Sequence, residues 1–189
     1  MKILMIGNSF TFFHKMPKIV ANICGAEVES NVKGGAYLAE QLNPETQLGA
    51  KFKELIETQK WDYVVIQEQS NAPALKKDRF QESADKLCKI IRENGAKPVF
   101  YATWAYKKDT EMLDSTGLDY DTMFKMMYDS YHEAASRNNA LIADVGKAFY
   151  ELSEFLNLYE PDAFHPSEAG SSIAAAIISK TILQEEAKK

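Results

Sequence analysis

The sequence of 189 residues contains few cysteines, no long apolar run and no basic run. Cys24 and Cys88 are too few for a disulfide framework, and because both lie among apolar residues we expect buried thiols. No stretch approaches the roughly 20 consecutive apolar residues that a membrane span needs. The formal net charge is −5. Without a basic run, this charge argues against nucleic acid or an anionic membrane surface as a partner.

Internal repeats, low-complexity segments and linkers rich in proline, glycine or serine are also absent. Met1 and Lys2 lead directly into an apolar run with no spacer or cleavage site, so we expect no signal peptide and a cytoplasmic location. Apolar residues make up 46% of the chain and charged residues 26%. These proportions and this length predict a single globular domain over residues 1–189.

Short apolar runs alternate with longer amphipathic stretches along the chain. The expected strands are 3–6, 27–32, 64–66, 99–102 and 141–145. All but the more polar 27–32 read as strands buried on both faces, and 27–32 is expected nearer a sheet edge. The expected helices are 15–24, 48–58, 80–94, 120–137 and 167–185. This alternation predicts an α/β protein, a three-layer α/β/α sandwich around a five-stranded parallel sheet.

Ser9 is the first candidate for chemistry, because ligands of such sheets bind beyond the carboxyl ends of the strands. It stands three residues past the run 3–6, behind Gly7 and Asn8, at an expected helix start. Backbone N–H groups at a helix start are unpaired, and with the helix dipole they favour a developing negative charge. The alternative is that Ser9 simply caps the helix.

Asp162 and His165 form the second candidate pair. A carboxylate three residues before an imidazole, at a turn that leads into the last expected helix, can bond one ring nitrogen and leave the other free as a general base. The other histidines, His14 and His132, fall in helical patterns without such an arrangement. We expect both to be structural.

Four blocks, taken in order, resemble those of the SGNH (GDSL-like) hydrolases. They are Gly-Asn-Ser-Phe-Thr at 7–11, Gly-Gly at 34–35, Gln-Glu-Gln-Ser-Asn at 67–71 and Asp-Ala-Phe-His-Pro at 162–166. The resemblance spans nearly the whole chain, and the combination is far more specific than any single block. It implies a flavodoxin-like three-layer fold and an esterase, lipase, thioesterase or carbohydrate deacetylase activity.

The same resemblance implies roles for individual residues. Ser9 would be the nucleophile, His165 the general base and Asp162 the acid that orients it. The oxyanion hole would combine the N–H groups of Ser9 and Gly35 with a side-chain amide from the third block, for which Asn71 is the first choice.

The third block departs from the Gly-x-Asn-Asp form that the family pattern uses. It is similar instead to the Gln-Gly-Glu-x-Asn/Asp block of some carbohydrate esterases of the superfamily. Gln67 and Gln69 therefore stay open as alternative amide donors beside Asn71. Glu68 also permits a different interpretation, a carboxylate pair with Asp162 as in glycoside hydrolysis.

Two long loops, 70–78 and 105–119, are expected to shape a substrate pocket at the same sheet edge. Phe10, Trp104 and Tyr106 are candidates for its lining, with core packing as the alternative for each. No spacing of histidine, cysteine or acidic residues matches a metal-ligand set, and we expect no cofactor.

The leading hypothesis is a serine esterase acting on a small-molecule ester with a small acyl group, such as acetyl on a carbohydrate; a thioesterase is its nearest variant. One alternative is a catalytically impaired protein of this fold that binds a sugar or acyl group. The other is a flavodoxin-like module whose first loop holds a phosphate or a flavin phosphate.

Overall fold

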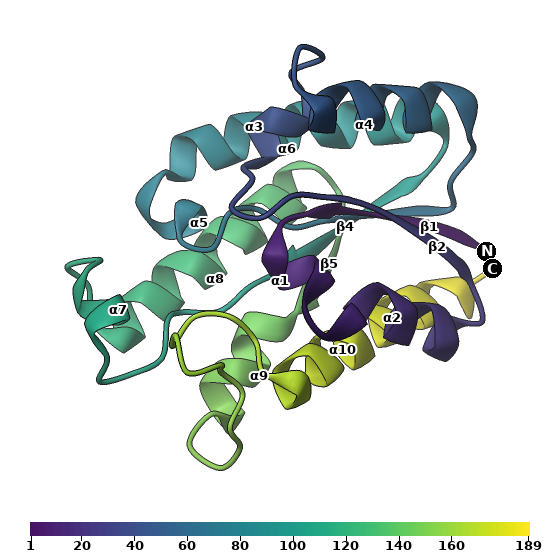
Figure 1. Cartoon of the computed structure of the whole chain (residues 1–189). Helices are drawn as coiled ribbons and strands as arrows, with labels where there is room; N and C mark the ends of the chain where they lie inside the picture. The colour runs from purple at the N-terminus through teal and green to yellow at the C-terminus, as the bar shows by residue number, and fades with distance from the viewer.

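A parallel sheet of five strands forms the centre of the computed structural model, which describes residues 1–189 (Figure 1). The strand order is β2-β1-β3-β4-β5. The strands are β1 (Lys2–Gly7), β2 (Glu27–Val32), β3 (Tyr63–Ile66), β4 (Lys97–Ala102) and β5 (Leu141–Asp144). The polar strand β2 lies at one edge, as its sequence predicts. The predicted three-layer sandwich with a five-stranded parallel sheet is therefore confirmed.

Each face of the sheet carries its own apolar core, because successive side chains of a strand point to opposite faces. Leu4 and Ile6 of β1 belong to one core, and Ile3 and Met5 belong to the other. All four are fully buried. The short apolar runs of the sequence are continuous for this reason: helices cover both sides of the sheet.

The helices divide between the two faces (Figure 1). One face is covered by α1 (Ser9–Phe12), α2 (Met16–Cys24), α9 (Val145–Leu152) and α10 (Glu168–Glu186). The other is covered by α3 (Leu38–Gln41), α4 (Gln47–Thr58), α5 (Ala72–Leu75), α6 (Lys77–Asn94), α7 (Glu111–Asp114) and α8 (Tyr120–Arg137). A single 3₁₀ turn, η1 (Phe13–Lys15), separates α1 from α2.

The last helix begins where the sequence predicts. Ser167 caps α10 by accepting the N–H of Gly170 at 3.1 Å. Its hydroxyl also donates to the carbonyl of Asn157 at 2.7 Å. This serine, two residues after His165, thus fixes the start of the helix at Glu168 and anchors the loop that precedes it.

The expectations for the end of β5 and for Cys24 were wrong. Val145 begins α9 and does not end β5. Cys24 is half-buried and lies at the last turn of α2, whereas Cys88 is buried as expected; both cysteines are free.

Candidate active site

A chain of hydrogen bonds joins Ser9, His165 and Asp162 at the carboxyl edge of the sheet. Ser9 Oγ lies 2.8 Å from His165 Nε2, across 156 residues of sequence. His165 Nδ1 lies 2.7 Å from Asp162 Oδ2. With the ring proton on Nδ1, the carboxylate accepts it and Nε2 is free to accept the serine hydroxyl proton. The structure thus brings together the three residues that the sequence predicts for acyl transfer, in the order that this chemistry needs.

The backbone before α10 holds Asp162 in place. Its Oδ1 accepts the N–H groups of Phe164 at 3.2 Å and His165 at 3.0 Å. The turn is completed by Ala163, whose φ of 68° is unusual for a residue with a side chain. Burial raises the pKa of the Asp162 carboxyl, but hydrogen bonds from the His165 ring and from these two N–H groups outweigh it and lower the pKa overall. Asp162 is therefore anionic at neutral pH.

Aromatic rings enclose the His165 imidazole. Phe13 stacks on it with ring centroids 4.3 Å apart and planes at 4°. Phe164 packs against it at 4.0 Å, and Phe10 meets it edge-on at 5.7 Å. The ring is therefore held from several directions, with 17% of its side chain exposed.

Ser9 is the first residue of α1 and not its cap. The cap is Asn8, whose Oδ1 accepts the N–H of Phe10 at 3.1 Å. The interpretation of Ser9 as an N-cap is therefore wrong. The N–H of Thr11 bonds the Asn8 carbonyl at 3.0 Å. Of the first three N–H groups of α1, that of Ser9 itself is therefore the one that Asn8 does not take up.

Gln67 holds the segment around Ser9 by hydrogen bonds to the residues on either side of it. Its Oε1 accepts the N–H of Asn8 and the hydroxyl of Thr11, each at 2.9 Å. A Cβ on Gly7 would lie 2.5 Å from the same oxygen, so this close approach requires glycine. Gln67 Nε2 donates to the carbonyl of Glu68, and the side chain is fully buried. Gln67 is therefore occupied as a structural support of the loop.

Glu68 joins the start of α3, three residues after Gly35, to the third block. Its Oε1 accepts the N–H of Leu38 at 3.0 Å and the N–H of Gln69 at 2.6 Å. Burial raises the pKa of the Glu68 carboxyl above its ordinary value, against the lowering effect of these two hydrogen bonds. Since Glu68 is engaged here and Asp162 is engaged with His165, the geometry does not support the glycosidase-like carboxylate pair.

Two of the expected oxyanion donors are unpaired. Gly35 has a φ of +69°, its N–H forms no hydrogen bond within the chain, and the space beside its Cα is open. The side-chain amide of Asn71 forms no hydrogen bond either, although its backbone N–H donates to Gln69 Oε1. Gln69 Nε2, in contrast, donates to Ser70 Oγ at 3.1 Å. Among the three third-block amides, that of Asn71 is the one left free.

The three expected pocket residues are buried, so this expectation needs correction. Phe10 is 1% exposed, Trp104 0% and Tyr106 4%. Trp104 stacks between Phe10 and Phe149 in the core and donates its Nε1–H to the carbonyl of Phe164 at 3.0 Å. Tyr106 lies within hydrogen-bonding distance of Ser70, 2.7 Å between hydroxyl oxygens. Bulky aromatic side chains at strand ends fill the core here because the sheet is covered on both faces.

A hollow of about 580 Å³ lies directly beside Asp162. Its lining residues are Thr110, Glu111, Met112, Ser115, Pro161, Asp162 and Ala163. Four of these come from the loop 105–119, which the sequence predicts to border the site. The particular residues could not be predicted, since they depend on the short helix α7.

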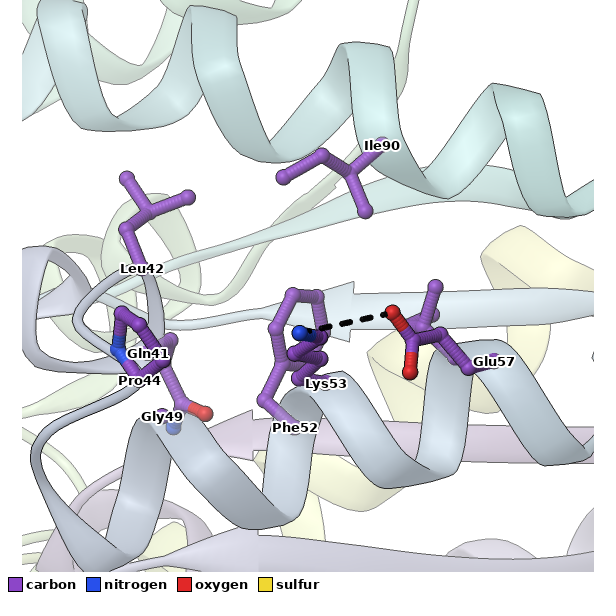
Figure 2. A pocket seen from close by; sticks show the side chains of 9 residues that line it. Gln41, Leu42, Pro44, Gly49, Phe52, Lys53, Glu57 and Ile90 are labelled. Carbon is purple, nitrogen blue, oxygen red and sulfur yellow. Dashed lines mark ion pairs between the residues drawn. The ribbon is translucent and has the colours of Figure 1, made fainter.

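A second cavity, of about 290 Å³, is separate from this site (Figure 2). It lies between α3, α4 and α6, where Leu42, Phe52 and Ile90 surround it and the ion pair of Lys53 and Glu57 spans 3.9 Å at its side. None of its lining residues takes part in the Ser9 arrangement.

Both remaining histidines pair with carboxylates. His132 Nε2 lies 2.8 Å from Asp144 Oδ1, within the structural role expected for it. His14 is not helical as expected: its φ of 49° and ψ of 28° are left-handed, and its Nε2 lies 2.8 Å from Glu160 Oε1. The pattern of apolar residues carried no signal for this pair, because it joins segments far apart in sequence.

None of the helices combines the length and the apolar character that crossing a bilayer demands. No protein-family model and no curated protein matches the sequence. Among solved structures, the chain is similar to a protein from Slackia heliotrinireducens that is classed with the SGNH hydrolases. The two share 38% identity over 96% of this chain and 98% of that one, with a TM-score of 0.92.

The chain is also similar in fold to the acetylxylan esterase Axe2 from Geobacillus stearothermophilus. That match has 20% identity and a TM-score of 0.72, and covers 96% of this chain and 93% of that one. The Slackia relative is similar enough in sequence, over nearly the full length of both chains, to establish the family. The chain belongs to the SGNH hydrolases.

Proposed function

We propose that this hydrolase is a serine esterase that removes a small acyl group through a covalent acyl-enzyme. The observation that carries the proposal is the chain of hydrogen bonds from Ser9 Oγ through His165 to Asp162, with distances of 2.8 and 2.7 Å. A serine is a weak nucleophile until a base accepts its proton, and an imidazole held by a carboxylate provides that base.

The reaction follows from this arrangement. Ser9 Oγ attacks the ester carbonyl carbon while His165 Nε2 takes the hydroxyl proton, and Asp162 stabilises the imidazolium that forms. The imidazolium then protonates the alkoxide leaving group, and the C–O bond of the ester breaks. Water, deprotonated by His165, attacks the acyl-serine in the second half, which releases the carboxylic acid and restores the hydroxyl of Ser9.

The oxyanion of each tetrahedral intermediate needs preorganised donors. In this proposal they are the N–H of Ser9, the N–H of Gly35 and the side-chain amide of Asn71. The free state of the Gly35 and Asn71 donors favours this set. Gln67 and Gln69 are less suited, because each already donates its amide to a neighbour.

The surroundings of the site favour a small acyl group on a polar alcohol. Phe10 and Trp104 are buried and leave no open apolar channel for a long acyl chain at their positions. The hollow beside Asp162 is lined by Thr110, Glu111 and Ser115, among others, and such groups hydrogen-bond hydroxylated compounds. An acetylated carbohydrate fits both features, and the fold likeness to an acetylxylan esterase agrees with it.

The hydrolysis of p-nitrophenyl acetate and butyrate tests the proposal. We expect Ser9→Ala and His165→Ala to lower kcat by about 10³-fold or more, with acetate cleaved faster than butyrate. His132→Ala is the matched control, since it removes a histidine that bonds a carboxylate elsewhere. Release of acetate from acetylated xylo-oligosaccharides tests the alcohol side. Equal activity of the wild type and Ser9→Ala would overturn the proposal.

A further inference from the structure

A second hydrogen bond joins the segment of the nucleophile to the loop of the base. His14 follows α1 and bonds Glu160 at 2.8 Å, while Ser9 begins α1 and bonds His165 at the same distance. The His14 and Glu160 side chains are 29% and 30% exposed, so the pair is shielded from water more than an ordinary surface ion pair.

Glu160 is built into the loop that carries His165. Its N–H donates to the carbonyl of His165 at 2.9 Å. Its own carbonyl accepts the N–H of Ala163 at 3.0 Å. A displacement of Glu160 therefore moves the backbone that presents both His165 and Asp162.

The backbone at His14 is bent into an unfavourable conformation. His14 has φ 49° and Lys15 has φ 57°, two successive left-handed residues that both carry side chains. Such conformations persist only where surrounding contacts hold them, and they are concentrated at functional sites. Here the contacts come from Phe13, which precedes the bend, and from His14 within it. Phe13 stacks on the His165 ring at 4.3 Å, and His14 bonds Glu160.

We propose that His14 and Glu160 are positioning residues that set the distance between the nucleophile and the general base. The inference rests on the proposed function, because it assigns the pair to the same Ser9 and His165. Neither residue contacts the reacting atoms in this account. Their bond fixes the η1 turn against the 160–165 loop, so that Phe13 lies flat on the imidazole and Nε2 stays within hydrogen-bonding reach of Ser9 Oγ.

His132 and Asp144 provide a matched control pair within the chain. Their separation is also 2.8 Å, and their side chains are 34% and 31% exposed. The pair links α8 to the end of β5 and makes no hydrogen bond to the nucleophile segment or to the 160–165 loop. The effect of losing any half-buried histidine–carboxylate bond is thereby separated from the effect of losing the bond between His14 and Glu160.

The test compares kcat and KM for p-nitrophenyl acetate in His14→Asn, Glu160→Ala, Glu160→Gln and the control His132→Asn. Asparagine tolerates the left-handed backbone but is too short to replace the imidazole. We expect His14→Asn and Glu160→Ala to lower kcat about tenfold with KM nearly unchanged. Glu160→Gln keeps an acceptor oxygen and should recover most of kcat, and His132→Asn should keep the wild-type value.

The double variant His14→Asn/Glu160→Ala should lose no more activity than either single variant, because both remove the same bond. Wild-type kcat in His14→Asn and Glu160→Ala, together with an inactive Ser9→Ala, would overturn the inference and leave the proposed function intact. The same holds if His132→Asn loses as much kcat as His14→Asn at equal melting temperatures. An active Ser9→Ala would overturn both.

Discussion

Asp162 shows how one side chain decides the behaviour of another. Its carboxylate holds the His165 ring through Nδ1 and is itself held by two backbone N–H groups. Because the Asp162 carboxylate can only accept a hydrogen bond, the ring proton lies on Nδ1. Nε2, which faces Ser9 Oγ, therefore carries no proton. The tautomer of His165 is thus determined by Asp162, a residue that does not contact Ser9.

Replacing Asp162 by Asn should lower kcat by about 10²- to 10⁴-fold with a small effect on KM, because the amide no longer enforces this tautomer. The folded-state pKa of Asp162 lies below 3.8, its usual value. The ionised carboxylate therefore adds stability above about pH 3.8, and this is lost as the pH falls through the lowered pKa. Urea unfolding of both proteins at pH 7 and pH 3 measures the difference, which should shrink at pH 3; a difference that grows there contradicts the assignment.

For Glu68 we expect the opposite dependence of folding stability on pH. Burial raises the pKa of the Glu68 carboxyl above its ordinary value of 4.5. Ionisation of this carboxyl therefore lowers the stability of the folded state as the pH rises above 4.5. Glu68→Gln keeps the oxygen that accepts from Leu38 and Gln69, and it should gain stability relative to the wild type between pH 4.5 and 7. Thermal melts across this range measure the trend, and a relative loss with rising pH would refute it.

The activities of Glu68→Ala and Glu68→Gln separate the effect of the Glu68 hydrogen bonds from the effect of its charge. Glu68→Ala should lose about tenfold in kcat, because the start of α3, which follows the loop of Gly35, is no longer tied to the third block. Glu68→Gln should stay within about threefold of the wild type, since the acceptor oxygen remains. Equal activity of Glu68→Ala and the wild type would show that this tie has no catalytic consequence.

At the residue scale, spacing in the sequence identifies only part of the site. Asp162 and His165 are visible because a local turn joins them, and Ser9 is visible because it follows a buried strand. The roles of Gln67 and Glu68 depend on which loop atoms they meet, and His14 depends on a left-handed turn. No periodic pattern encodes such contacts.

At the scale of elements, the loop after β2 presents a free N–H because it contains a left-handed glycine. Gly35→Ala should cost about 1–2 kcal/mol of stability through its φ of +69°. It should also lower kcat, because relaxation of the strained backbone reorients the N–H. Gly25→Ala is the matched control, with a φ of +57° and open space at the C-cap of α2. Denaturant unfolding and kcat of both variants check this: an equal loss of kcat in the two contradicts the role of Gly35.

Long elements were easier to predict than short ones. The helix over 120–137 matches its prediction. The helix predicted over 80–94 begins three residues earlier, at Lys77, because the first three residues are charged and add nothing to the apolar period. The four-residue helices α3, α5 and α7 carry too few residues for an apolar period to emerge. Helix α9 was missed because it starts directly from β5 without a loop.

At the scale of the whole molecule, the two cores lie back to back on one sheet and share its strands. The chain contains two tryptophans, and they fall on opposite faces: Trp61 belongs to one core and Trp104 to the other. Both are buried. The sandwich follows from the alternation of strands and helices, whereas the strand order depends on crossovers that the sequence pattern does not specify.

This arrangement predicts that both faces unfold together. In Trp61→Phe and Trp104→Phe, the remaining tryptophan reports on one core. Its fluorescence transition in urea should coincide with the far-ultraviolet circular dichroism of the same variant. Separate midpoints in either variant would mean that one layer of helices detaches before the sheet unfolds.

The most direct test of the account is the site at which a fluorophosphonate probe reacts, located by mass spectrometry of the labelled protein. We expect one label on Ser9, absent from Ser9→Ala, strongly slowed in His165→Ala and unchanged in His132→Ala. No label on an active wild-type protein, or a label on a different serine, would contradict the assignment of Ser9 as the nucleophile.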